Sequence, residues 1–275
     1  MKRTFVVPVM SCICIGICMA AGSCAVRKTA VRDNVELKEG ARGSAEENIL
    51  LAEIQEYNRM LTSLEGEAMV VYRDPERTLS FRSAVVATGD ASVLRLDLDE
   101  FVFRTPIATV VKTQDEVYTY IHPEKTYFVT PVDEADFGTF LGFEVPVRFL
   151  FHSLLGRVYL PQESSGSRMI DERHLEIKGR AEEEIVRFGP KGLPEGLEYH
   201  RAGGPESGDI YRVNFDKYEV SGSASDQQPF PMVVTVKSGK KSLEIRYSVV
   251  TVNGEIKEGV FTPEDTEFSG YKKQN

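Results

Sequence analysis

Hydrophobic and polar residues alternate with a period of two along most of the chain after residue 66. In the segment "SVLRLDLD" the alternation is strict, with Leu94, Leu96 and Leu98 on one face and charged residues on the other. One apolar face and one polar face are typical of a strand in an antiparallel sheet that is solvated on one side. Turn signals separate further segments of this kind: "EAMVVYRD", "TLSFRSAVVAT", "IATVVKTQ", "EVYTYIHP", "KTYFVTPV", "HLEIKG", "EIVRFG", "GLEYHR", "DIYRVNFDKYEV", "FPMVVTVKSG", "SLEIRYSVVTVNG" and "EIKEGVFTPE".

Two regions break this alternation and predict helices. From Ser44 onward apolar residues recur at helical spacing, Ser44 and Glu47 fit a capping box, and Gly66 can end the helix. Residues 133–156 contain "DEADFGTFLG" and "VPVRFLFHSLLG", which we interpret as two short helices. These elements predict a mainly β, α+β fold, in which a curved antiparallel sheet of about ten or more strands wraps round helices; a closed barrel is the alternative. No repeat or boundary divides residues 45–275, so we expect a single domain.

The first 24 residues differ from the rest of the chain. Lys2 and Arg3 precede an uncharged apolar run, and this pattern predicts a secretory signal peptide. The small residues Ala21-Gly22-Ser23 stand directly before Cys24, which resembles the lipobox of bacterial lipoproteins, although a lipobox usually begins with Leu. The resemblance implies that residues 1–23 are removed and that Cys24 is acylated; residues 24–44 then form a lipidated, flexible tether. A plain secreted protein and an uncleaved membrane helix are the alternatives.

Composition and charge exclude several classes of function. The chain has four cysteines, and Cys12, Cys14 and Cys18 would be removed with the signal peptide. If Cys24 is acylated, no thiol remains for disulfides, thiol catalysis or zinc binding. The net charge of −9 argues against a nucleic-acid partner, because phosphate binding needs a cationic surface. The acyl chains, rather than electrostatic attraction, would hold such an acidic protein on a membrane.

The sequence shows no catalytic motif. Neither a zinc-binding helix motif, a G-x-S-x-G elbow nor a phosphate-binding loop is present, and the four histidines are isolated from one another: His122, His152, His174 and His200. The acidic runs "DEADF" and "AEEEI" are typical of a solvated surface. We therefore expect no enzyme, no cofactor and no metal site; a hydrolase assembled from residues distant in sequence is the alternative.

The order of elements resembles that of the bacterial LolA/LolB-like proteins, with LolB-type outer-membrane receptors as the nearest likeness. The segment "LEGEA" at 64–68 is similar to their helix-to-strand junction, and "GFEVPVRFLFHSLLG" at 142–156 is similar to their helix pair. Their Pro-Leu-Gly loop corresponds to Pro106-Ile107-Ala108, and the Trp residues common in these proteins are missing. The resemblance covers residues 45–265 and implies an unclosed antiparallel half-barrel, covered by an N-terminal helix and a short helical lid.

The resemblance also implies a function. LolB-type proteins are lipid-anchored in the outer membrane and face the periplasm, where they take acylated lipoproteins from a periplasmic LolA-type carrier and help insert them into the outer membrane. We expect the same cargo, carrier and location here, and a monomer. The alternative is an envelope scaffold or adaptor lipoprotein, which would bind a protein partner through the same fold without transferring lipid.

Two sets of site residues follow from the resemblance. The loop that dips into the bilayer corresponds to Phe101, Val102, Phe103 and Ile107; the alternative is that the two Phe side chains fill one end of the core. Periodicity does not distinguish a usable cavity from a solid core, which is the ordinary state of a sheet of this size. The concave face that holds acyl chains corresponds to eight positions: Leu94, Leu96, Leu98, Val111, Tyr118, Tyr120, Phe149 and Leu154.

Overall fold

The computed structural model describes residues 45–137, 143–161, 166–201, 210–221, 227–257, 259–262 and 268–274. All of these belong to one compact unit, Asn34–Asn275. The expected signal peptide, Cys24 and the tether lie outside the described residues, so their assignment stays a prediction.

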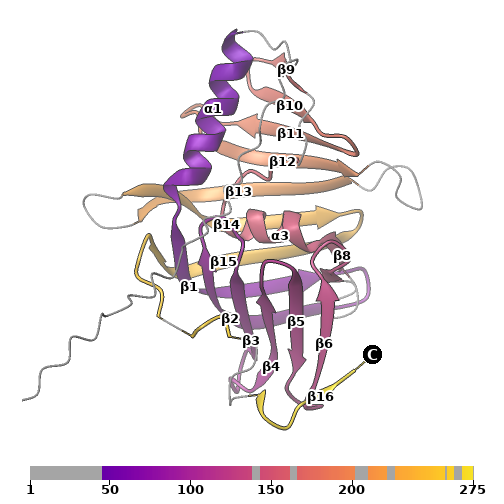
Figure 1. The fold of residues 1–275 in the computed structure, drawn as a ribbon. Coiled ribbons are helices and arrows are strands. Elements are labelled where there is room, and N and C mark those ends of the chain that lie inside the picture. Colours follow the sequence, from indigo (N-terminus) through magenta and orange to yellow (C-terminus); the bar gives the residue numbers. More distant parts are fainter. Residues whose placement is uncertain are drawn as a thin grey trace, which may run out of the picture. The chain divides into compact units, whose positions relative to one another are not determined.

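A single 14-stranded sheet dominates the domain, and β1 lies in its middle (Figure 1). On one side of β1 the strands follow in chain order, each antiparallel to the one before. This half consists of β1 (Ser63–Arg73), β2 (Thr78–Thr88), β3 (Leu94–Glu100), β4 (Pro106–Lys112), β5 (Glu116–Ile121) and β6 (Thr126–Pro131). Short antiparallel connections explain the order, because each turn returns the chain beside the strand that it has just left.

The other half of the sheet is built from the far edge inwards. After β6 the chain leaves the sheet and re-enters it at the opposite edge, and the later strands return in order until β15 pairs with β1. These strands are β9 (Gly166–Asp171), β10 (His174–Lys178), β11 (Glu182–Phe188), β12 (Pro194–Arg201), β13 (Ile210–Ser221), β14 (Gln228–Ser238) and β15 (Lys241–Val252). The sheet is curved and unclosed, as the family resemblance implied, and β16 (Lys272–Lys273) adds a short parallel strand beside β6.

The connection between the halves carries β7 (Asp136–Phe137), β8 (Phe143–Pro146) and helix α3 (Val147–Leu154). The second of the two short helices is confirmed as α3. The first is wrong in its described part, because Asp136 and Phe137 form a two-stranded sheet with β8; the rest of that segment lies outside the described residues. The strand expected at 255–264 is also wrong, since its described residues form no strand.

Helix α1 (Ala45–Met60) is shorter than the sequence predicted. Residues 63–66 belong to β1, where Leu64 pairs with Val252 of β15 and Ala87 of β2. Tight backbone packing explains Gly66 better than a helix end does, because a side chain there would meet the carbonyl oxygen of Val249 at 3.0 Å. Gly66 therefore allows the backbones of β1 and β15 to approach closely where the two halves of the sheet meet.

The main hydrophobic core lies on the face of the sheet that α1 and α3 cover (Figure 1). Leu51 and Ile54 of α1 are buried in it, together with the inward-facing residues of both halves of the sheet. A second, smaller cluster joins Val111, Tyr120 and Phe268. Phe268 belongs to the C-terminal segment, so this segment packs against β4 and β5.

Candidate functional site

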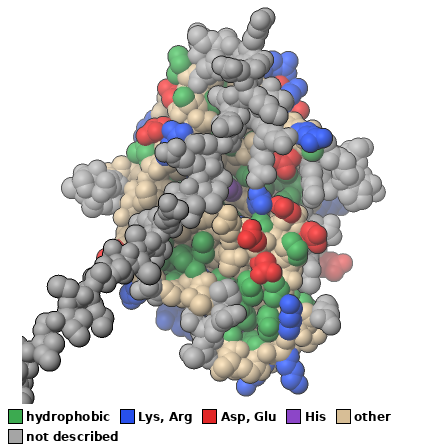
Figure 2. Space-filling view, in the orientation of Figure 1, with side chains coloured by type: hydrophobic (Ala, Val, Ile, Leu, Met, Phe, Trp, Pro, Cys, Tyr) green, Lys and Arg blue, Asp and Glu red, His purple; other side chains and the backbone are tan. Residues whose placement is uncertain are grey.

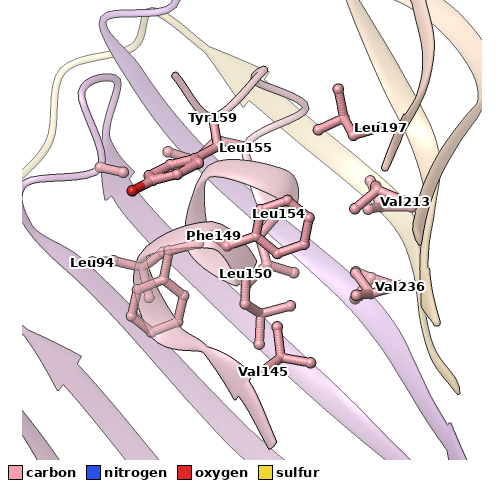
Figure 3. Packing of buried hydrophobic residues seen from close by; sticks show 14 of the residues in the cluster. Leu94, Val145, Phe149, Leu150, Leu154, Leu155, Tyr159, Leu197, Val213 and Val236 are labelled. Carbon is pink, nitrogen blue, oxygen red and sulfur yellow. The ribbon is translucent and has the colours of Figure 1, made fainter. Parts of the chain in front are cut away.

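Helix α3 closes the interior of the unclosed sheet. Six of its eight residues are buried, and only Arg148 and His152 reach the surface in part. Figure 3 shows Phe149, Leu150 and Leu154 between the strands of the two halves, where Val213 and Val236 approach from one of them. A helix this short is marginal in water alone, so its packing against the sheet holds it in place.

The space beneath α3 is small and entirely apolar. A cavity of about 20 Å³ lies between α3 and β1, β2, β3 and β15, which is room for about one water molecule. Ligand pockets are typically about 300–1,000 Å³, so an acyl chain needs α3 to move outwards. The lining is Val70, Val85, Leu96, Leu98, Leu150, Leu154, Leu243 and Ile245.

The structure separates the eight predicted lining residues into two groups. Leu96, Leu98 and Leu154 line the cavity, and Leu94 and Phe149 are buried in the same core. The structure contradicts the other three positions: Val111 and Tyr120, with Tyr118 packed against them, form the second cluster with Phe268. Val110 lies in the main core while Val111 does not, because neighbouring residues of a strand point to opposite faces.

Sequence reasoning missed five of the eight residues that line the cavity. Val70 and Val85 belong to β1 and β2, Leu243 and Ile245 to β15, and Leu150 to α3. The four strand residues stand in apolar stretches of predicted strands, and Leu150 belongs to the predicted helix, so the signal was present in the sequence. What the sequence did not show is that β15 returns to pair with β1.

Hydrogen bonds fasten the chain where α3 ends. The hydroxyl of Tyr247 donates to the carbonyl of Leu154 at 2.8 Å, and both groups are buried. The side chain of Asn58 in α1 donates to the carbonyl of Val158 at 2.8 Å and accepts from its N–H at 3.1 Å. The hydroxyl of Tyr57 donates to the carbonyl of Gly156 at 3.1 Å. These bonds hold the chain at the C-terminal end of α3 against α1 and β15.

The loop between β3 and β4 is an apolar tip. Phe101, Val102 and Phe103 are 41%, 69% and 83% exposed. The alternative interpretation, in which the Phe side chains fill one end of the core, is therefore wrong. Three consecutive apolar side chains in water are costly, and such exposure is typical of a surface that meets a membrane or a protein.

Local hydrogen bonds hold this tip in shape. The N–H of Glu100 donates to the carbonyl of Thr105 at 2.8 Å, and the N–H of Arg104 donates to the carbonyl of Glu100 at 3.1 Å. The Glu100 carboxylate also accepts the N–H of Val102 at 2.9 Å. The guanidinium of Arg82 lies 5.5 Å from the centre of the Phe101 ring. The tip is thus a preformed turn that presents its side chains outwards.

Ile107 does not belong to this tip. It lies in β4, is half-buried and packs against the main core. Its carbonyl accepts the N–H of His122 at 3.0 Å, which ties it to the turn after β5. The exposed part of the predicted loop is therefore 101–103, and Ile107 belongs to the strand that follows it.

Two ionisable side chains are shielded from water: His152 of α3, which is half-buried, and Glu184 of β11, which has no exposed surface. Burial, together with the nearby charges of Arg157 and Lys112, holds the pKa of His152 well below its usual value. Burial raises the pKa of Glu184 well above its usual value, and Glu182 adds to that rise. Both groups are therefore held towards their neutral forms.

The described residues contain neither a cluster suited to a metal ion nor a helix suited to crossing a membrane. Within them, no three His, Cys, Asp or Glu side chains come together as a metal site would need. None of the described helices combines the length and the hydrophobicity needed to cross a bilayer. Figure 2 shows hydrophobic side chains at the surface over the lower half of the view, where β3–β6 lie in Figure 1.

Comparison with solved structures identifies the architecture. The domain superposes on an outer membrane lipoprotein-sorting protein domain from Vibrio parahaemolyticus with a TM-score of 0.56 at 10% identity, covering 78% of this chain and 95% of that chain. A LolA superfamily protein from Nitrosomonas europaea gives 0.52 at 10% identity, over 78% and 97% of the two chains. The fold is LolA-like.

A third similar structure carries no functional description in its name. It is a DUF1329 family protein from Desulfovibrio piger, with a TM-score of 0.57 at 11% identity, covering 78% of this chain and 95% of that chain. No family model and no curated protein sequence matches the chain. At such low identities the likeness establishes the LolA-like fold and leaves function to the residues themselves.

Proposed function

We propose that this protein is a membrane-anchored lipoprotein that binds the acyl chains of other lipoproteins beneath α3 and helps insert them into the outer membrane. The observation that carries the proposal is the apolar cavity of an unclosed sheet beneath α3, a helix of only eight residues. Acyl chains bind by burial of apolar area without directed polar contacts, and every residue that lines the cavity is aliphatic.

The remaining parts of the proposal fit around that interior. An acylated Cys24 would hold the domain at the membrane, and a periplasmic LolA-type carrier would deliver the cargo. The exposed tip 101–103 would enter the bilayer and release the acyl chains there. Because the cavity is only about 20 Å³, loading would require α3 to move outwards.

Binding of a fluorescent acyl probe tests this function. The chain from Ala25 onward contains the whole compact unit Asn34–Asn275 and lacks the acylated cysteine. We expect a dansyl-labelled fatty acid to bind saturably with a blue-shifted emission, because the probe enters an apolar interior. An unlabelled tri-acylated lipopeptide should displace it. A folded protein, checked by circular dichroism, that shows no saturable change would contradict the proposal.

The second candidate function is an envelope adaptor that binds a protein partner without handling lipid. The small volume beneath α3 favours it, since a filled interior needs no ligand. In that case the acyl probe does not bind, and the exposed tip 101–103 is the candidate partner surface.

A further inference from the structure

Positive charge gathers at the end of the sheet that carries the apolar tip 101–103. Ala108 of β4 pairs with Ile121 of β5, so the turn 122–125 that follows β5 lies at the same edge of the sheet as the tip. The short strand β16 runs beside the first residues of β6 and adds its two lysines to this edge (Figure 1). Three segments that are far apart in the sequence therefore meet at one end of the sheet.

These segments are basic although the whole chain is acidic. Residues 100–105, 122–125 and 272–273 hold four Lys and Arg side chains against two Glu side chains, whereas the whole chain has a net charge of −9. None of the four cations forms an ion pair within the part of the chain that the structure describes. All four are exposed: Arg104, Lys125, Lys272 and Lys273.

The acids nearby do not neutralise this charge. The carboxylate of Glu100 accepts N–H groups of the tip itself. Glu124 is exposed and stands alone against the lysines of its turn and of β16. Arg82 and Asp99, which face each other across β2 and β3, add equal and opposite charges. The end of the sheet therefore keeps an excess of positive charge around its apolar tip.

Two of the four cations stand at backbone positions that suit glycine better. The φ angle is +55° at Arg104 and +51° at Lys125, in the left-handed region that residues with a Cβ rarely adopt. Residues held in such conformations are frequent at sites that contact a ligand. These two long, exposed side chains are therefore candidates for a contact outside the protein.

The apolar tip and the lysines stand at different heights. Glu100 and Thr105, whose hydrogen bond closes the tip, lie three residues beyond the pairing of Ala108 with Ile121, which is about 10 Å at the rise of a strand. The lysines of the turn and of β16 therefore stand behind the apolar side chains. The headgroup layer on each side of a bilayer is about 5–8 Å thick. A tip that enters the hydrocarbon would place these lysines among the lipid phosphates.

We propose that this end of the sheet docks on the head groups of anionic phospholipids, whose phosphates pair with the four cations while the tip 101–103 enters the hydrocarbon. The proposal rests on the proposed function, from which it takes the entry of the tip into a bilayer, and it adds the class of lipid. A single Lys or Arg near an anionic membrane surface strengthens binding about fivefold. A few such residues therefore suffice, whatever the charge of the whole chain.

Vesicle flotation with the chain from Ala25 onward tests the lipid preference. This chain holds every described residue and lacks the acylated cysteine, which would bind any bilayer. Vesicles of phosphatidylcholine are the neutral probe, and an equimolar mixture with phosphatidylglycerol is the anionic probe. We expect partitioning into the anionic vesicles to be at least about tenfold stronger. Salt at about 1 M should remove the preference, because the screening length falls to about 3 Å.

Charge variants locate the contact. Lys272→Gln with Lys273→Gln should lower partitioning into the anionic vesicles about tenfold, and Arg104→Gln should lower it about fivefold. The matched control is Lys217→Gln with Lys237→Gln, which removes two exposed lysines from β13 and β14 in the other half of the sheet. The control should bind both kinds of vesicle as the wild type does.

A tryptophan in the tip reports whether tip and cations act together. The chain contains no Trp, so Phe103→Trp gives a single emission that should shift to shorter wavelength with anionic vesicles only. An unshifted emission, equal partitioning into both kinds of vesicle, wild-type partitioning in both charge variants, or an equal loss in the control would overturn the proposal. The acyl-probe titration uses no vesicles, so failure of the docking proposal and failure of the proposed function are seen separately.

Discussion

Glu184 occupies a position that few carboxyl groups tolerate, within a β-strand and with no exposed surface. Burial raises its pKa well above the usual value, so the folded protein favours the protonated form. In the unfolded chain the group ionises near its ordinary pKa, about 4.3. The contribution of Glu184 to the free energy of unfolding is therefore fully present below the ordinary pKa, where the group is protonated in both states. It is lost as the pH rises through the raised pKa of the folded protein.

Replacing Glu184 by Gln should remove this pH dependence. The amide has the same shape but no charge to desolvate, so we expect Glu184→Gln to be more stable than the wild type by about 2 kcal/mol at pH 8 and nearly equal to it at pH 4. Urea unfolding at pH 4, 6 and 8 measures the difference. Glu183→Gln should leave the pH profile unchanged, and a Glu184→Gln variant that is less stable at pH 8 would refute the argument.

At the scale of elements, the loop between β3 and β4 shows what could be predicted from the sequence and what could not. The run Phe101-Val102-Phe103 suggested either a membrane-entering tip or one end of the core, because hydrophobicity alone is compatible with both. The choice depends on the bond between Glu100 and Thr105, which turns the chain before these side chains can reach the core. That hydrogen bond follows from the register between β3 and β4, which the residue types alone do not predict.

The same loop yields a prediction about delivery to membranes. Phe103→Glu should lower the transfer of an acylated lipoprotein from its carrier into phospholipid vesicles about tenfold, because a carboxylate resists entry into the bilayer. Stability should change by less than about 0.5 kcal/mol, since Phe103 is 83% exposed. Val220→Glu, at an apolar position that is 66% exposed in β13, is the matched control. Equal transfer by both variants would exclude the loop from delivery.

At the scale of the whole molecule, the sequence predicted the class of fold and left its closure undetermined. Alternation fixed the apolar face of β3, and helical spacing fixed α3, so Leu96, Leu98 and Leu154 were predicted correctly as neighbours. The assignment of Tyr120 failed because apolar residues occur on both faces of β4 and β5. One face packs on the core, and the other is covered by a segment nearly 150 residues later in the chain.

That long-range cover provides a test of the whole architecture. Phe268 stacks on Tyr120 with 3.8 Å between ring centres, and Tyr271 hydrogen-bonds His122 at 2.7 Å. Phe268→Ala should lower the free energy of unfolding by about 3 kcal/mol, because a buried ring is lost. Tyr271→Phe should cost only about 1 kcal/mol, because it removes one hydrogen bond and keeps the ring.

Urea unfolding measures both values. If Phe268→Ala changed the stability by less than about 0.5 kcal/mol, as an exposed residue does, the C-terminal segment would not be packed on β4 and β5. The outer face of that half would then be open to solvent. In that case Val111 and Tyr120 would form an exposed apolar patch available to a partner, and the adaptor function would gain support over lipid transfer.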